Sequence, residues 1–338
     1  MNEKEPELVG SYQAPVHEVE TFTAKSMTEP LPGTYIYDLE QEIAGVPVLK
    51  FKGKAGQKIT IRYGEVLYPD LPEYKGLVGQ MLQANLREAS NEDTYYCKGE
   101  GIEIYKPRFT FHGFRYIEIS GVDEAPALED VQAVLLSSVD QITGKFHCDN
   151  ELINRFTQNV KFSQYCNFIS IPTDCPQRNE RLGWTGDAQV FAPTASYHMD
   201  TRAFFHKFVK DLRDEQKMID GAVPNYVPNI GHKEDAGSVW GDIATFLPYT
   251  LYIYFGNQEE MNYCYPLMKD WVDYIDRKDG ERGEKHYLFD FGFHFGDWLA
   301  LDGATPTSFK GSTEDTYIAS VYIVSLFVRP QKLQRHWD

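Results

Sequence analysis

Alternating hydrophobic and polar positions over the first 142 residues predict a domain of β-strands. In the run 57–67, Ile59, Ile61 and Tyr63 alternate with polar residues, and this period of two places their side chains on one face of a strand. Comparable short runs occupy residues 34–38, 46–53, 93–99 and 114–121. They follow one another at hairpin distances without helical periodicity between them, which favours an antiparallel β-sandwich. The segment 76–89 fits either a short helix or a loop.

The period changes to that of amphipathic helices after residue 149. Asp149 and Asn150 precede a helical pattern and are suited to cap its first turn. Helices are predicted over 151–166, after Thr185, and over 201–218, 239–255, 258–276 and 313–328. One of them carries a hydrophobic stripe, which consists of Phe204, Phe205, Phe208, Val209 and Leu212. The second part of the chain is therefore predicted to be all-α.

Composition and charge narrow the functional classes. The 338 residues are 42% hydrophobic and 25% charged, as expected for a folded protein. Asp and Glu number 50 against 33 Lys and Arg, a net charge of −17, which repels phosphate backbones and anionic lipid surfaces. The longest mostly apolar run, 317–328, is too short for the roughly 20 residues that a membrane span requires. We therefore expect neither nucleic acid nor a membrane as a partner.

The N-terminus and the cysteines bear on the cellular compartment. The first ten residues lack the basic and apolar regions of a secretory signal, which favours the cytoplasm, or the periplasm if the natural N-terminus lies further upstream. The five cysteines are odd in number, widely spaced and never arranged as CxxC. This pattern favours free thiols over disulfides or a zinc site.

The densest chemistry lies in the segment 174–189, DCPQRNERLGWTGDAQ. It carries three carboxylates, Asp174, Glu180 and Asp187, around Trp184. Acid catalysis on a glycosidic bond needs a carboxyl group that keeps its proton near neutral pH, and neighbouring carboxylates raise the pKa of such a group. A tryptophan offers a flat apolar face on which a sugar ring can stack. The segment is therefore a candidate acid site for glycoside cleavage.

Two glycines and two arginines in this segment leave a second interpretation open. Gly183 and Gly186 argue against one continuous helix, so a turn can direct several carboxylates to one place. Arg178 and Arg181 can instead neutralise the acids in ordinary surface ion pairs. The segment alone does not decide between these interpretations.

Two later loops repeat the combination of a tryptophan with an aspartate. They contain Trp240 with Asp242, and Asp297 with Trp298. Each pair alone fits a core tryptophan at a helix start with an aspartate cap as well as it fits a sugar contact. Three such pairs in loops between helices of one domain favour a carbohydrate cleft.

Several motifs together resemble the bacterial α-L-rhamnosidases of glycoside hydrolase family 78. The segment 174–189 resembles the signature loop of that family, and the loops around Trp240 and Trp298 resemble its later sugar-binding loops. The other motifs resemble the β-sandwich and the linker that lead into its catalytic domain. They are RYGEVLYPD (62–70), EDTYYCKGEG (92–101), PRFTFHGFRYIEISG (107–121) and TGKFHCDNELINR (143–155).

The resemblance implies a jelly-roll-like antiparallel β-sandwich followed by the first half of an (α/α)6 toroid of six helical hairpins. Residues 1–30 would be the remnant of a preceding module or a linker, and 31–142 would be the sandwich. Residues 143–338 would be the N-terminal part of the catalytic domain. About six helices are predicted where a complete toroid has twelve, so the chain resembles a member that is truncated at its C-terminus.

The resemblance also implies roles for individual residues. Glu180 would protonate the leaving-group oxygen as general acid, while Asp174 and Asp187 would hold rhamnose hydroxyls. An apolar wall around the sugar would consist of Trp184, Trp240 and Trp298, and weaker candidates for hydroxyl contacts are Asp242 and Asp297. No metal and no organic cofactor is implied.

The implied reaction is the inverting hydrolysis of terminal α-L-rhamnose from glycosides or polysaccharides. Inversion needs a second carboxylate that activates water at about 6.5–9.5 Å from the acid. The family's general base lies in the later half of the toroid, so it is not expected in this chain. Two alternatives stay open: an inactive sugar-binding remnant without the base, which could form homo-oligomers through its exposed half-toroid, and an (α/α)6 hydrolase for another sugar.

Overall fold

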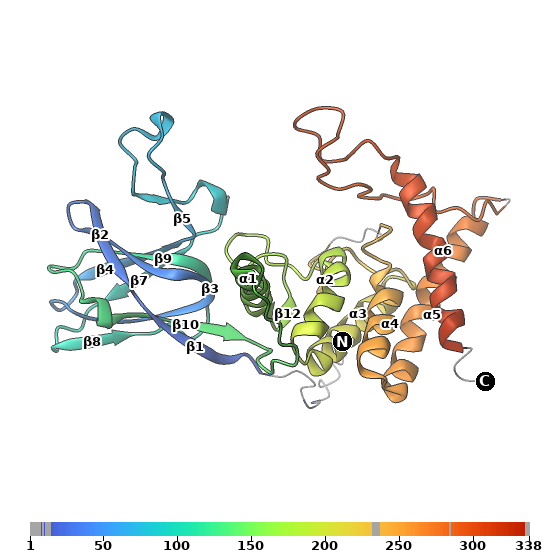
Figure 1. Ribbon diagram of the computed structural model, residues 1–338, viewed down its shortest axis with the longest axis horizontal. Helices are drawn as coiled ribbons and strands as arrows, with labels where there is room; N and C mark the ends of the chain where they lie inside the picture. Colours follow the sequence, from blue (N-terminus) through green and yellow to red (C-terminus); the bar gives the residue numbers. More distant parts are fainter. Residues whose placement is uncertain (1–7, 9, 11–14, 232–236, 284, 335–338) are drawn as a thin grey trace, which may run out of the picture. The chain divides into compact units, whose positions relative to one another are not determined.

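The computed structural model describes Leu8, Gly10 and residues 15–231, 237–283 and 285–334 (Figure 1). The chain forms two compact units that divide between Gly183 and Trp184. We call residues 16–183 the sheet unit and the described residues from 184 onward the helical unit. The division falls inside the segment 174–189, so that segment contributes to both units.

An antiparallel sheet of eight strands forms most of the sheet unit. The strands are β1 (His17–Thr23), β2 (Ser26–Leu31), β3 (Thr34–Lys52), β4 (Lys58–Gly64), β7 (Glu92–Tyr96), β8 (Ile102–Tyr105), β9 (His112–Ser120) and β10 (Val131–Ser137). Their order is β1-β10-β3-β9-β4-β7, and β2 and β8 also pair with β3. Ile59, Ile61 and Tyr63 on β4 are fully buried, which confirms the alternation that predicted this strand.

Strand β3 joins two groups of strands because it changes partners along its length. Its first part pairs with β2 and β9, and its last part pairs with β10 and β8. The register shifts between Asp38 and Ile43, where Glu40 has a positive φ of 58°. Both carboxylate oxygens of Asp38 accept hydrogen bonds of 2.8 Å from Arg115 on β9, and this pair holds the irregular stretch of β3 in place.

One stretch of the sheet unit differs from its expected role, and for another the structure decides between two alternatives that the sequence left open. Residues His17–Leu31, within or next to the stretch predicted as a preceding module or linker, form β1 and β2 of the same sheet. The segment 76–89 is a loop rather than an α-helix. It contains the two-residue strand β6 (Met81–Leu82), which pairs with β5 (Val66–Leu67), and the 3-10 turn Ala84–Leu86.

The first helix, α1 (Glu151–Asn167), belongs to the sheet unit. Its N-cap is Asn150, whose side chain accepts hydrogen bonds from the backbone N–H groups of Leu152 and Ile153, as the sequence predicted. The helix packs on β3 and β10, and it is followed by a short hairpin of β11 (Phe168–Ile169) and β12 (Ile171–Pro172). The two compact units therefore divide well after residue 142. The boundary between the sandwich and the catalytic domain at that residue stays a prediction.

The helical unit consists of five α-helices and long loops. The helices are α2 (Thr185–His198), α3 (Arg202–Met218), α4 (Ile243–Phe255), α5 (Gln258–Gly280) and α6 (Asp315–Gln334). Together with α1 they confirm the six helices predicted from the sequence. The hydrophobic stripe of α3 is buried, and α3 packs against α4 and α5. The architecture agrees with the predicted sandwich followed by helical hairpins.

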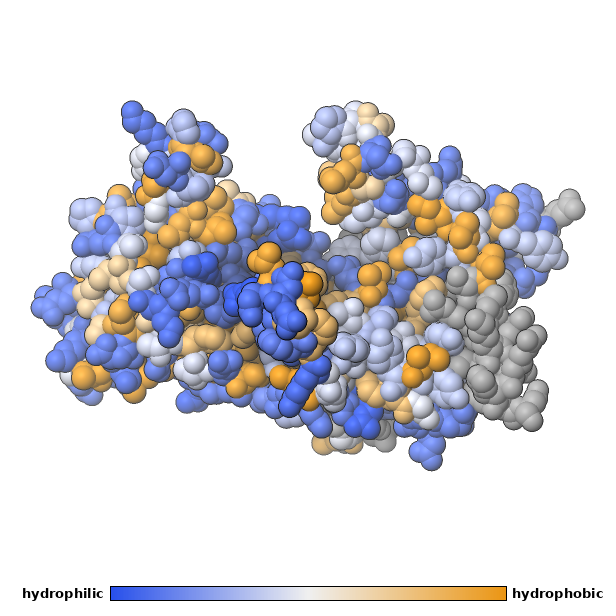
Figure 2. Space-filling view, in the orientation of Figure 1, coloured by the Kyte–Doolittle hydropathy of each residue, from blue (hydrophilic) through white to orange (hydrophobic). Residues whose placement is uncertain are grey.

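The described surface is mixed in polarity. Figure 2 shows hydrophobic residues scattered among hydrophilic ones on the visible face of the sheet unit. On α6, Val321 and Val324 are at least half exposed. None of the helices within the described ranges combines the length and the apolar character needed to cross a bilayer. All five cysteine thiols are free.

Candidate active site

The acidic part of the signature segment, Asp174–Gly183, is an irregular loop that ends the sheet unit. The backbone N–H of Asp174 donates to the carbonyl of Leu182 at 3.2 Å, which closes the loop on itself. Arg181 takes a positive φ of 48°, a conformation that ordinary helix geometry does not allow. The segment is therefore not one continuous helix, as the sequence predicted, although Gly186 lies inside the helix that starts at Thr185.

Glu180 is held by two arginines that reach the same carboxylate oxygen. Nη2 of Arg178 lies 2.8 Å from Oε2 of Glu180, and Nη1 of Arg87 lies 3.1 Å from that oxygen. The same Arg178 nitrogen lies 3.8 Å from Oδ2 of Asp174. The side chain of Glu180 is 24% exposed, so it is accessible to a ligand. Arg178 thus does pair with the acids, as the second interpretation of the sequence allowed, and it also brings Asp174 and Glu180 together.

The donor set of this loop fits an ion-pair network better than a metal centre. Ligand atoms of Asp174, Cys175 and Glu180 lie within 4.8 Å of one another. However, the guanidinium of Arg178 supplies positive charge to both carboxylates. Burial raises the pKa of the Cys175 thiol to about 11, which keeps it protonated at neutral pH, whereas metal binding requires the thiolate.

The loop is fixed to the sandwich by contacts with two other segments. The side-chain amide of Asn91 donates to the carbonyl of Gln177 at 2.7 Å. Arg181 donates to the carbonyl of Phe111 at 3.1 Å, and its guanidinium lies 4.8 Å from the centre of the Phe111 ring. A side chain at Gly113 would lie within 3.0 Å of Gln177 and Pro176, so the loop approaches β9 closely only because this residue is glycine.

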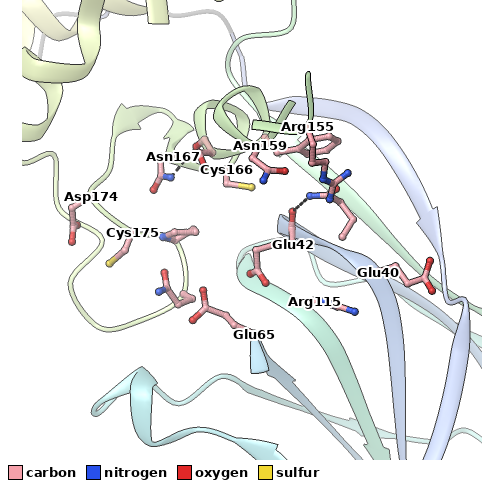
Figure 3. Close-up of a pocket in the computed structure, with 15 residues that line it drawn as sticks. Glu40, Glu42, Glu65, Arg115, Arg155, Asn159, Cys166, Asn167, Asp174 and Cys175 are labelled. Carbon is pink, nitrogen blue, oxygen red and sulfur yellow. Dashed lines mark hydrogen bonds between the residues drawn. The ribbon is translucent and has the colours of Figure 1, made fainter. Parts of the chain in front are cut away.

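A cavity of about 520 Å³ lies in the sheet unit beside the loop and is lined in part by Asp174 and Gln177. Figure 3 shows the carboxyl groups of Glu42 and Glu65 directed into it. Burial, and then the nearby charge of Glu65, raise the pKa of Glu42 to about 8. Burial also raises the pKa of Glu65, while hydrogen bonds from Gln177 and Asn85 and the charge of Arg178 oppose this change.

In the helical unit, the three tryptophans that were predicted to form an apolar wall all contact one phenylalanine. The centre of the Phe295 ring lies 6.0 Å from that of Trp184, 4.2 Å from that of Trp240 and 5.3 Å from that of Trp298. Trp240 is buried, whereas Trp298 is 41% exposed. Tyr226 also contacts Trp184, with 5.1 Å between the ring centres. We call these five residues the aromatic cluster.

The start of α2 fixes one side of this cluster. The hydroxyl and the backbone N–H of Thr185 both donate to the carbonyl of Asn225 at 2.9 Å, which anchors the residue next to Trp184. A Cβ at Gly186 would lie 2.7–2.9 Å from ring atoms of Trp240. The first turn of the helix can therefore lie flat against that indole only because position 186 has no side chain.

The predicted aspartates of the helical unit occupy different environments. Asp187 is exposed in the first turn of α2. Asp297 is half-buried, and its Oδ2 lies 2.5 Å from the place where a Cβ at Gly311 would be.

Asp242 has a structural environment rather than an open one. It is fully buried, and its Oδ1 accepts a 3.0 Å hydrogen bond from the indole of Trp271. Its Oδ2 accepts from the backbone N–H of Val239 at 2.7 Å and lies 3.3 Å from the hydroxyl of Ser238. These contacts hold the turn before α4, which favours the structural interpretation of Asp242 over a sugar contact.

Two important residues were not found from the sequence. Phe295 forms the centre of the aromatic cluster. The alternation of aromatic residues at 291, 293 and 295 is the feature of the sequence that could have indicated it. Arg87 reaches Glu180 although the two are 93 residues apart. Arg87 is a single arginine in an irregular segment, and no repeated pattern in the sequence indicates its contact with Glu180.

Comparisons with known proteins identify the family. The bacterial α-L-rhamnosidase six-hairpin glycosidase domain matches residues 141–334, and the bacterial α-L-rhamnosidase concanavalin-like domain matches residues 28–137. The chain is similar to an α-L-rhamnosidase of Streptomyces avermitilis, with 37% identity over 306 residues that cover 90% of this chain. An α-L-rhamnosidase of an Alteromonas species is also 37% identical, over 84% of this chain.

Solved structures give the same result. The crystal structure of the Streptomyces avermitilis α-L-rhamnosidase complexed with L-rhamnose is matched with a TM-score of 0.83 and 36% identity, over 94% of this chain and 29% of that one. The α-L-rhamnosidase from Dictyoglumus thermophilum is matched with a TM-score of 0.84 and 32% identity, over 95% and 35%. The chain belongs to the bacterial α-L-rhamnosidase family, glycoside hydrolase family 78. It spans 28–30% of the length of the curated relatives.

Proposed function

We propose that the chain carries the acid half of an inverting α-L-rhamnosidase that removes terminal α-L-rhamnose from glycosides or polysaccharides. The observation that carries this proposal is the arrangement of Glu180. Its carboxyl group is accessible, it is held through one oxygen by two guanidinium groups, and Arg178 links it to the second carboxylate of the loop, Asp174. Family membership and the relatives named as α-L-rhamnosidases support the choice of sugar.

In this proposal each group has one task. Glu180 gives its proton to the leaving-group oxygen as the glycosidic bond breaks, and water attacks the opposite face of the sugar ring. Asp174 and Asp187 hold rhamnose hydroxyls. The exposed Trp298 and its neighbours in the aromatic cluster supply an apolar wall for the methyl-bearing ring. The resemblance implies a base for the activation of water in the later half of the toroid, and the proposed reaction uses no metal or organic cofactor.

The partner of this site is thus a rhamnose-containing glycoside or polysaccharide. Asp297 remains a weaker candidate for a hydroxyl contact, whereas the hydrogen bonds and burial of Asp242 favour an indirect role. Association of copies through open helix faces remains a prediction.

The test is the substitution Glu180→Gln, made in the protein with a complete six-hairpin domain. Glutamine keeps the shape but has no proton to transfer, so hydrolysis of alkyl rhamnosides should fall by at least about 10²-fold. Glu100→Gln, on an exposed turn of the same unit, is the matched control and should behave as the wild type. Rhamnose release and its anomeric configuration are followed by ¹H NMR. Unchanged turnover by Glu180→Gln, or a retained anomeric configuration, would contradict the proposal.

A further inference from the structure

The segment that carries Arg87 is anchored on both sides. Before it, the side-chain amide of Gln83 donates to the carbonyl of Tyr63 at 3.2 Å, and that of Asn85 donates to Glu65 at 2.9 Å. Leu86 is buried. After it, Asn91 donates to the signature loop. Arg87 therefore projects from a fixed arm of the sandwich and not from a free loop end.

The backbone of Arg87 is held in a conformation that few residues with a side chain adopt. Its φ is 58° and its ψ is −118°. Such a conformation persists only where the surrounding contacts require it, and such residues cluster at functional sites. The side chain is 56% exposed, so solvent is available to it. The guanidinium nevertheless lies against Glu180.

The two arginines distinguish the two oxygens of Glu180. Arg87 donates a hydrogen bond to Oε2, and the guanidinium of Arg178 forms an ion pair with the same oxygen at 2.8 Å. An oxygen that faces two guanidinium groups is the less favourable of the two carboxyl oxygens for a proton. Within the part of the chain that the structure describes, no residue is hydrogen-bonded to Oε1. The proton that a general acid transfers would therefore be carried on Oε1.

We propose that Arg87, a residue of the concanavalin-like domain, is a positioning residue for Glu180. Together with Arg178 it fixes Oε2 as an acceptor, so that Oε1 carries the proton and faces the leaving-group oxygen. The sandwich then contributes to catalysis in addition to its structural role. This inference rests on the proposed role of Glu180 as general acid.

The decisive comparison uses substrates that need protonation to different degrees. Arg87→Met should lower kcat on alkyl rhamnosides by about 10-fold, a part of the 10²–10⁴-fold that general acid catalysis supplies. On dinitrophenyl rhamnoside, whose leaving group needs no proton, the loss should stay below about 3-fold, because protonation then contributes little to the barrier. KM should change little on either substrate. Arg87→Lys should recover part of the loss, and Arg108→Met, at an exposed arginine of the same unit, is the matched control.

Two further measurements separate positioning from other roles. In a Glu180→Gln background, Arg87→Met should cause no further loss on alkyl rhamnosides, because there is no acid left to position. An equal loss in both backgrounds, or an equal loss on both substrates, would overturn the proposal in favour of direct substrate binding or a structural role. The ¹³C resonance of the Glu180 carboxyl carbon should move in Arg87→Met and not in Arg108→Met.

These results also separate the two levels of the inference. An unchanged carboxyl resonance in Arg87→Met would overturn the contact itself, whether or not the protein hydrolyses rhamnosides. Wild-type protein with a complete six-hairpin domain that releases no rhamnose would contradict the proposed function and with it the catalytic role of Arg87. Normal activity of Arg87→Met, together with loss of activity in Glu180→Gln, would overturn only the role given to Arg87.

Discussion

The acidic loop and the aromatic cluster are stabilised by different forces. In the loop, Glu180 is oriented by ion pairs with Arg87 of the sandwich and Arg178 of the loop itself, and the neighbouring cavity holds partly buried carboxyl groups. In the cluster, three tryptophan rings pack around the partly buried ring of Phe295, and their orientation follows from these ring contacts. Buried apolar area is insensitive to pH, whereas the protonation of buried carboxyls is not. The two regions should therefore respond differently to pH and to the loss of one side chain.

The largest expected effect concerns Glu42 in the sheet unit. Its pKa is raised from 4.5 to about 8 by burial and by Glu65, so the folded state binds this proton more tightly than the unfolded state. The stabilisation that comes from this bound proton is complete below pH 4.5, declines from pH 4.5 to 8 and is lost above pH 8. Since one pKa unit corresponds to about 1.36 kcal/mol, Glu42→Gln should stabilise the sheet unit at pH 9 by on the order of 5 kcal/mol.

Hydrogen exchange of β3 and β9 peptides, read at pH values on both sides of this window, measures the effect. Glu42→Gln and wild type should have similar stability at pH 4 and differ most at pH 9. Glu40→Gln, on the exposed side of the same irregular stretch, is the control. If Glu42→Gln left the pH dependence of the sheet unit unchanged, the buried carboxyl would not be its source.

A smaller effect is expected for Phe295, which tests the cluster. Phe295→Ala removes the ring that three tryptophans share and should cost the helical unit about 2–4 kcal/mol. Trp298→Ala removes a ring that is 41% exposed and should cost about 1 kcal/mol or less. All five tryptophans lie beyond residue 183, so urea unfolding followed by tryptophan fluorescence reports this unit.

Rhamnose binding distinguishes a sugar wall from a structural core. Under the proposed function, Trp298→Ala should weaken rhamnose binding several-fold in calorimetry although the fold is retained. Full affinity of a folded Trp298→Ala variant would argue that the exposed ring does not contact the sugar, and equal destabilisation by both substitutions would refute the central place of Phe295.

The smallest effect is expected for His294, next to the cluster, and its sign is opposite to that of Glu42. Nδ1 of this buried histidine accepts a 3.0 Å hydrogen bond from the backbone N–H of Ser238, and burial lowers its pKa below 6.5. The unfolded state therefore binds the proton more tightly. The contribution of neutral His294 to the stability of the helical unit is complete above pH 6.5 and is lost as the pH falls below that value. His294→Gln should flatten this acid-side decline in the fluorescence-monitored unfolding of the helical unit; a decline as steep as in wild type would assign it to another group.

The sequence predicted features that repeat along the chain and missed those that depend on a single distant contact. The alternation in β4 and the stripe of α3 are periodic, and both appear as expected. Repeated pairing of tryptophan with aspartate pointed to Trp184, Trp240 and Trp298, which do meet in the structure. The same pattern could not distinguish Asp242 from a sugar-binding aspartate, although its carboxylate accepts a hydrogen bond from the indole of Trp271. Arg87 could not be predicted at all, because its relation to Glu180 exists only after the sandwich has folded.

The change of partners along β3 also has a consequence for cooperativity. One strand of 19 residues pairs with β2, β8, β9 and β10, and α1 packs on it as well. Detaching β3 from any one neighbour disturbs the others, so β3 and the strands paired with it should open together and not one at a time. The arm that carries Arg87 and the loop that carries Glu180 are both attached to this single cooperative block, and local fluctuations of the sandwich should therefore leave their spacing unchanged.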